Sequence, residues 1–197
     1  MAKLYFRYGT VGSAKTLNLL AVAHNYKQQG KKIMLLKPSM DVRFGESLIR
    51  SRAGLEQEAD MLINEKTVLD PRSFEGLSCV LVDEAQFLKT SLIDQLRLIA
   101  AEGGVPVICY GLRQDFRGHL FEGSKRLLEL ADSIEEVKTT CAFCNRKATM
   151  NLKHLNGRAS IAGLSIELGS EEKYFPACYP CYTDSKPESI FLQSRAQ

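Results

Sequence analysis

The chain has 197 residues, of which 45% are hydrophobic and 25% are charged, and its formal net charge is +3. A chain of this length and composition is typical of a globular protein with one main core and a small additional domain. Its charge is too small to indicate a nucleic-acid or membrane partner, and it contains no apolar run of about 18 residues that would span a bilayer.

Short apolar segments alternate with helical patterns over residues 1–140. Helical spacing predicts helices from residue 15 to Gly30, around Leu92–Ile99, and over residues 120–131. Residues 38–77 give no clear pattern. Alternation of strand and helix predicts an α/β fold, in which helices cover both faces of a parallel sheet. The expected strands are residues 4–8, 33–36, 79–82, 105–110 and 134–137.

Residues 9–16, GTVGSAKT, differ at one position from the phosphate-binding loop G-x-x-x-x-G-K-[ST]. Lys15 and Thr16 are in place, but Ala14 replaces the second glycine, at a cost of about 1 kcal/mol if its backbone is left-handed. Backbone N–H groups of such a loop hold phosphate, the lysine neutralises phosphate charge, and the hydroxyl binds Mg²⁺. An inert strand-to-helix turn is the alternative. The expected ATP contacts are Gly9, Thr10, Val11, Gly12, Ser13, Ala14, Lys15 and Thr16.

A second motif, Val80-Leu81-Val82-Asp83-Glu84, ends a buried strand in two carboxylates. Asp83 matches the aspartate that holds Mg²⁺ in P-loop proteins. Glu84, beside that metal, is well placed to take the proton from an attacking hydroxyl. The alternative is that the Asp-Glu pair caps the next helix. The preceding phosphate loop favours the catalytic interpretation.

Four of the six cysteines form two C-x-x-C pairs, Cys141/Cys144 and Cys178/Cys181. The N-terminal residues lack the apolar region and cleavage site of a signal peptide, which favours the cytoplasm, where structural disulfides are rare. Four thiolates at this spacing indicate a closed, structural zinc site. Redox C-x-x-C motifs are the alternative, disfavoured because neither pair is expected to open a helix in a strand-helix unit.

Taken together, these motifs resemble the type II thymidine kinase family. The resemblance covers residues 4–182 and implies a RecA-like P-loop domain, a small zinc-ribbon-like domain and a homo-oligomer, usually a tetramer. It implies domains at 1–140 and 141–184, and we expect a flexible polar tail at 185–197. The motifs that carry it are GTVGSAKT (9–16), Asp41-Val42-Arg43, VDEAQF (82–87), YGLRQDFRG (110–118), and the two C-x-x-C pairs with Lys173-Tyr174 before the second.

The implied reaction is transfer of the ATP γ-phosphate to the 5′-hydroxyl of thymidine, a step of nucleotide salvage, with deoxyuridine as a further acceptor. By the same resemblance, Glu84 is the general base, Thr16, Asp83 and Asp41 serve magnesium, and Arg43 lies near the phosphates. Residues 165–174 match the segment that closes over the nucleoside. The implied nucleoside contacts are Phe87, Leu112, Phe116, Ile166, Gly169, Ser170 and Tyr174.

Two other functions stay open at this stage. A P-loop domain with a four-cysteine module can be an ATPase that grips nucleic acid, and basic residues slightly outnumber acidic ones between Cys144 and Cys178. Alternatively, the protein binds a nucleotide with catalysis impaired by Ala14. Nucleoside-dependent turnover distinguishes the kinase from both.

Overall fold

The computed structural model describes residues 1–155, 157–163 and 173–185. Its larger part is a six-stranded sheet with the strand order β5-β2-β6-β7-β1-β8, in which every neighbouring pair is parallel. The predicted α/β fold is therefore confirmed. The strands of this sheet are β1 (Leu4–Gly9), β2 (Ile33–Pro38), β5 (Met61–Ile63), β6 (Cys79–Val82), β7 (Val107–Leu112) and β8 (Ser133–Glu136).

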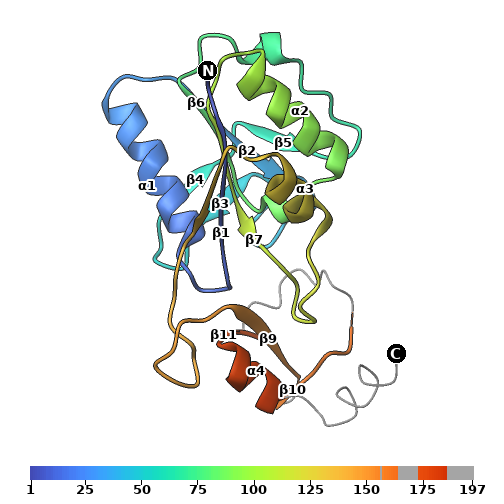
Figure 1. The fold of residues 1–197 in the computed structure, drawn as a ribbon. Coiled ribbons are helices and arrows are strands. Elements are labelled where there is room, and N and C mark those ends of the chain that lie inside the picture. Colours follow the sequence, from blue (N-terminus) through green and yellow to red (C-terminus); the bar gives the residue numbers. More distant parts are fainter. Residues whose placement is uncertain (156, 164–172, 186–197) are drawn as a thin grey trace.

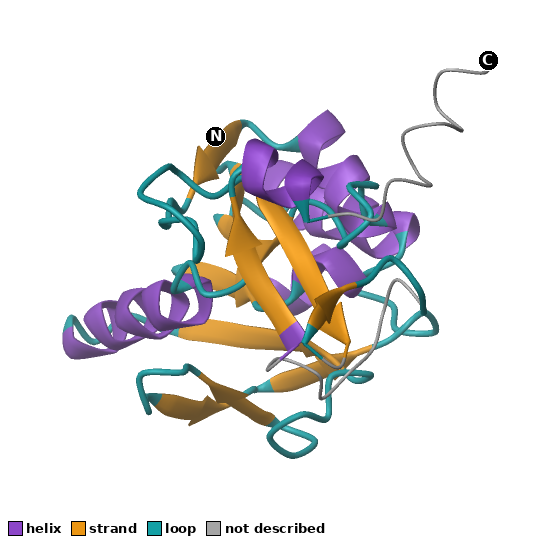
Figure 2. Ribbon diagram, turned by 90° about the horizontal axis from the view of Figure 1, so that it is seen from below, coloured by secondary structure: helices purple, strands orange, loops and turns teal. Residues whose placement is uncertain are grey.

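Helices cover both faces of this sheet because its central strands are apolar on both sides. Along β6, Val80 and Val82 belong to one buried cluster, while Cys79 and Leu81 belong to the other. Helix α1 (Lys15–Gln28) packs into the second cluster, whereas α2 (Thr90–Ala101) and α3 (Glu122–Leu130) pack into the first. Figures 1 and 2 show helices on both sides of the strands.

A second, smaller sheet follows the large one in the chain. It has the order β10-β9-β11, with antiparallel pairs, and the short helix α4 (Tyr179–Asp184) packs against β9. In Figure 1 this sheet lies beyond the carboxyl ends of the parallel strands. The strands are β9 (Met150–Leu155), β10 (Arg158–Ala159) and β11 (Tyr174–Ala177).

Residues 38–77, which gave no clear sequence pattern, contain short strands and one turn of helix. A hairpin of β3 (Leu48–Arg50) and β4 (Glu56–Glu58) stands apart from the large sheet, and β5 adds a strand beside β2. The 3₁₀ turn η1 (Pro71–Phe74) begins at Asp70, whose side chain accepts a hydrogen bond from the Arg72 backbone. Strands of three residues are too short to show a period of two.

Two predictions from the sequence, the start of one strand and the setting of one C-x-x-C pair, were wrong. Strand β7 begins at Val107 and not at residue 105, because Pro106 has no N–H to donate to a neighbouring strand. The second C-x-x-C pair does open a helix, since Cys178 is the N-cap of α4 directly after β11. In the described ranges, no helix has both the length and the apolar character needed to cross a membrane.

The tight docking of α3 gives a test of the fold. A Cβ on Gly123 would lie 2.5 Å from the Ala85 carbonyl oxygen and 2.7 Å from that of Leu88, in the turn that follows Glu84. We expect Gly123→Ala to lower the free energy of unfolding by about 1–3 kcal/mol, as overpacking does. At a helix position without this crowding, alanine would instead be more stable than glycine. Urea unfolding measures this change; a stabilised variant would contradict the packing.

Candidate active site

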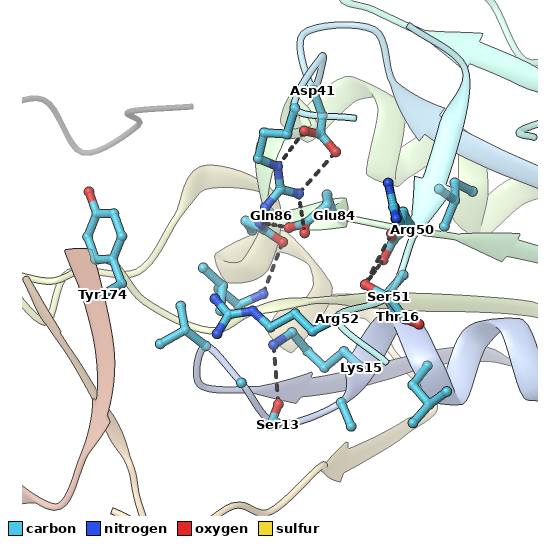
Figure 3. Close-up of a pocket in the computed structure, with 18 of the residues that line it drawn as sticks. Ser13, Lys15, Thr16, Asp41, Arg50, Ser51, Arg52, Glu84, Gln86 and Tyr174 are labelled. Atoms are coloured by element: carbon cyan, nitrogen blue, oxygen red, sulfur yellow. Dashed lines mark hydrogen bonds and ion pairs between the residues drawn. The ribbon is translucent and has the colours of Figure 1, made fainter. Parts of the chain in front are cut away.

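A cavity of about 280 Å³ lies at the carboxyl ends of β1, β6 and β7. Ligands of parallel α/β sheets bind at this edge, because the loops that leave the strands converge there. The loop after β1 supplies residues 11–16, the turn after β6 supplies Asp83 and Glu84, and Tyr174 comes from the small sheet. Figure 3 shows Tyr174 on the opposite side of the cavity from Thr16 and Ser51.

The phosphate-binding loop closes on itself. The Lys15 Nζ donates to the Thr10 carbonyl oxygen at 2.7 Å and to the Ser13 hydroxyl at 3.2 Å (Figure 3). Gly9 permits this closure, since a Cβ there would lie 2.3 Å from the Ser13 Oγ and 2.5 Å from the Val137 carbonyl oxygen. Burial lowers the pKa of Lys15 to about 8, although the negative charges of Glu84 and Asp83 oppose that shift.

Ala14 adopts the left-handed backbone conformation, with φ 62° and ψ 27°. It is the N-cap of α1, and its carbonyl accepts the first helical hydrogen bond, from the Asn18 N–H at 2.9 Å. The loop therefore keeps the shape that a glycine would favour, and the alanine adds strain of about 1 kcal/mol.

A hydroxyl and a carboxylate meet beside this loop. The Thr16 Oγ1 lies 3.3 Å from both carboxylate oxygens of Asp83, which is 5% exposed. Burial raises the pKa of Asp83, and the neighbouring negative charge of Glu84 adds to that effect. The charged form of Asp83 is therefore short of positive partners, as expected for a carboxylate that serves a cation.

Glu84 is held by two donors in the turn after β6. Its Oε1 accepts from the Arg43 Nη2 at 2.5 Å, and its Oε2 accepts from the Gln86 Nε2 at 2.5 Å (Figure 3). Arg43 also binds Asp41 through two hydrogen bonds, at 2.6 and 3.0 Å. Burial raises the pKa of Glu84, but the Arg43 charge and the two donors outweigh it, so this pKa lies below its ordinary value.

The geometry of this turn does not fit the alternative in which Glu84 only caps the next helix. Glu84 precedes the 3₁₀ turn η2 (Ala85–Phe87), has φ 49°, and makes no side-chain capping bond. A left-handed backbone at a non-glycine residue costs free energy and is often found at functional sites. The Glu84 side chain therefore binds Arg43 and Gln86 in the cavity and does not cap the helix end.

The opposite end of the cavity is apolar and aromatic. Phe116 is 2% exposed, and its ring centroid lies 6.0 Å from that of Tyr174. Val11, Phe87 and Leu112 line the same cavity. Most of the expected nucleoside-covering segment lies outside the described residues, including Ile166, Gly169 and Ser170, as does nearly all of the expected tail, 186–197.

The four C-x-x-C cysteines form one cluster in the small sheet region. Their sulfur atoms all lie within 4.8 Å of one another, with Cys144 Sγ 3.5 Å from Cys178 Sγ and 3.7 Å from Cys181 Sγ. Four sulfurs at about 2.3 Å from one tetrahedral zinc would lie about 3.8 Å apart. The two pairs therefore act as one donor set, which disfavours separate redox motifs.

Sequence reasoning missed several residues of this site. The buried side chain of Asn151 joins the two sheets, since its Oδ1 accepts from the Val11 N–H and its Nδ2 donates to the Gln114 carbonyl. Arg50 and Arg52, at the end of β3, also line the cavity. The polar Asn151 between the apolar Met150 and Leu152 was the available signal. No sequence signal pointed to Arg50 and Arg52, because the β3–β4 hairpin showed no recognisable strand pattern in the sequence.

The loop around Lys15, the Thr16–Asp83 pair and the half-buried Glu84 beside an arginine define a class of protein. Together they offer groups that can hold phosphate and a cation, next to a charged carboxylate, in one cavity. This combination of groups is typical of P-loop phosphotransferases.

Comparison with known proteins identifies the family within this class. The family model described as thymidine kinase matches residues 2–182. A thymidine kinase of Lactococcus lactis is 44% identical over 190 residues, which are 95% of this chain and 100% of the relative. One of Streptococcus gordonii is 44% identical over 184 residues, 92% of this chain and 96% of the relative. The chain belongs to the thymidine kinase family.

The matched residues include the four cysteines of the cluster. Among solved structures, the Pif1 helicase of Candida albicans aligns with a TM-score of 0.40 and 11% identity, over 69% of this chain and 36% of that chain. A likeness this low carries no argument about function.

The strain at Ala14 can be measured directly. We expect Ala14→Gly to raise the free energy of unfolding by about 1 kcal/mol, because glycine adopts the left-handed conformation without steric cost. For a chain of this size the melting temperature rises by about 2–4 °C. Ala21→Gly, at an exposed position inside α1, is the matched control and lowers stability by about 1 kcal/mol. Equal effects at both positions would refute the strain at Ala14.

Proposed function

We propose that this chain transfers the γ-phosphate of ATP to the 5′-hydroxyl of thymidine, with Glu84 as the general base and deoxyuridine as a further acceptor. The observation that carries the proposal is the position of Glu84. Glu84 lines the same cavity as the phosphate loop and the aromatic residues Phe116 and Tyr174, and its pKa is lowered, so it is charged at neutral pH.

The phosphate loop would hold the phosphates of ATP. Loop residues 11–14 and the first residues of α1 line the cavity, and Lys15 supplies positive charge below its pKa of about 8. Binding of phosphate would draw the Lys15 ammonium away from the Thr10 carbonyl. Arg43, already beside Glu84, is a second cation within the cavity. These groups would offset the charge that spreads over the transferred phosphoryl group.

A magnesium ion fits the oxygen donors beside this loop. The Thr16 hydroxyl and the Asp83 carboxylate would hold it, and Asp41 offers a further carboxylate in the same cavity. The raised pKa of Asp83 supports this assignment, because a cation would stabilise its charged form. When bound, Mg²⁺ neutralises phosphate charge and orients the β and γ groups.

Glu84 would accept the proton of the 5′-hydroxyl as that oxygen attacks the γ-phosphorus. The new bond joins the 5′-oxygen to phosphorus, and the bond from phosphorus to the β–γ bridging oxygen breaks, which yields ADP and the nucleoside 5′-monophosphate. A positioned general base contributes about 10²- to 10⁴-fold to such a step.

The apolar end of the cavity would bind the thymine ring. Phe87, Leu112, Phe116 and Tyr174 offer aromatic and aliphatic surface of the kind that binds a flat base. By resemblance, residues 165–174 would read the edge of the base through backbone groups.

A structural zinc ion fits the sulfur positions of Cys141, Cys144, Cys178 and Cys181. Since the nucleoside-covering segment lies between the two cysteine pairs, this metal would tether both of its ends and reduce the entropy lost on ordering. We propose residues 1–140 and 141–184 as two functional domains. A tetramer and a cytoplasmic location stay predictions.

The kinase proposal is tested by ADP release from Mg-ATP with thymidine, deoxyuridine, deoxycytidine or no acceptor. For Glu84→Gln, which keeps the size of the side chain and removes its basicity, we expect kcat with thymidine to fall at least about 100-fold. Glu122→Gln, at an exposed carboxylate paired with Lys89, is the control and keeps kcat. ATP binding without nucleoside-dependent turnover in the unaltered protein would contradict the proposal and favour impaired catalysis.

Zinc binding has its own test. We expect one zinc ion per chain by metal analysis, and we expect Cys144→Ser to lose it and to lower the melting temperature, because a structural zinc contributes folding energy. Cys109→Ala, which alters a buried cysteine outside the cluster, is the control and retains the zinc. A full zinc content in Cys144→Ser would contradict the four-cysteine site.

A further inference from the structure

The two oxygens of the Glu84 carboxylate have different partners. Oε1 accepts from the guanidinium of Arg43, which belongs to the charged end of the cavity with Asp41. Oε2 accepts from the neutral amide of Gln86, two residues along the chain. We infer that Gln86 is a positioning residue for phosphoryl transfer, which holds the Glu84 carboxylate in the orientation that accepts the proton. This inference rests on the proposed role of Glu84 as the base.

A backbone group fixes which way the Gln86 amide points. The Leu112 N–H, at the end of β7, donates to the Gln86 Oε1 at 3.0 Å. An N–H can only donate, so the oxygen of the amide must face Leu112 and its NH₂ group must face Glu84. The Glu84 carboxylate is thus connected through one side chain to the central sheet (Figure 3).

The side chain of Gln86 has little freedom to leave this position. It is 2% exposed. A Cβ on Gly111 would lie 2.6 Å from its Oε1 and 3.1 Å from its backbone nitrogen, so the glycine before Leu112 provides the space for the amide. Besides ending strand β7, Gly111 leaves room for the Gln86 amide and Leu112 donates a hydrogen bond to it.

A neutral donor suits this task better than a second cation would. Two cations on one carboxylate would lower its pKa further and weaken it as a proton acceptor, whereas an amide fixes its direction at a smaller cost in basicity. The amide also stays in place if Arg43 turns toward a phosphate. Leu112 also lines the apolar end of the cavity. The same residue therefore contacts the proposed nucleoside site through its side chain and orients Gln86, the partner of the general base Glu84, through its N–H.

The test is a double-mutant cycle on kcat with thymidine, measured for Gln86→Met, Glu84→Gln and the double variant. Gln86→Met keeps the side-chain length and removes both hydrogen bonds. We expect kcat to fall about 10- to 100-fold, with the KM for thymidine changed less than about threefold, because a small misplacement of a reacting group is costly. In the Glu84→Gln background, Gln86→Met should cause no further loss, since Gln86 acts through Glu84.

Two further variants separate positioning from stability. Gln86→Leu also removes both hydrogen bonds and has a similar volume, so we expect the same loss of kcat in a protein that still folds, as a thermal melting curve would show. Gln95→Met is the matched control: the Gln95 Oε1 accepts the Leu69 N–H at 2.6 Å, outside the cavity, and its loss should leave kcat unchanged.

The outcomes distinguish this inference from the proposed function. If Glu84→Gln keeps full turnover, Glu84 is not the base and both fail. If Glu84→Gln loses turnover but Gln86→Met and Gln86→Leu keep kcat, Glu84 remains the base and the positioning role is overturned. A loss in the Gln86 variants of the same size with and without Glu84 also overturns it, because Gln86 would then act independently of the carboxylate.

Discussion

The constraint on which this site depends is the close approach of charged groups that are buried or half-buried. Asp41, Asp83 and Glu84 share a cavity with Lys15 and Arg43, and removing such charges from water costs several kcal/mol each unless partners compensate. Arg43 compensates two of the three carboxylates directly. Asp83 keeps only the Thr16 hydroxyl as a side-chain partner among the described residues, which leaves it as the carboxylate that a cation would stabilise most.

The fold places these charges by means of two strained turns. Among the described residues, the non-glycine residues with positive φ are Ala14 and Glu84, and each follows a strand of the parallel sheet and precedes a helical segment. At Glu84 the strain accompanies the side chain that we propose as the general base. At Ala14 a glycine would give the same backbone at lower cost, so the departure from the glycine pattern affects stability and leaves the shape of the loop unchanged.

The sequence predicted those parts of the site that follow from local pattern. The strand-loop-helix order around Lys15, the buried strand before Asp83 and the spacing of the four cysteines each depend on neighbouring residues, and the structure has all three. The role that we infer for Gln86 could not be predicted from the sequence, because it depends on the Leu112 N–H from a distant strand. The roles of Asn151 and of the β3–β4 hairpin likewise arise from packing between segments far apart in the chain.

The most direct test of the account is a crystal structure of the protein with thymidine and a non-hydrolysable ATP analogue. We expect the thymidine 5′-oxygen to lie within about 3 Å of a Glu84 carboxylate oxygen, as a general base requires, with Gln86 still donating to that carboxylate. A 5′-oxygen that contacts another side chain, with Glu84 still bound only to Arg43 and Gln86, would contradict the central claim that Glu84 takes the proton.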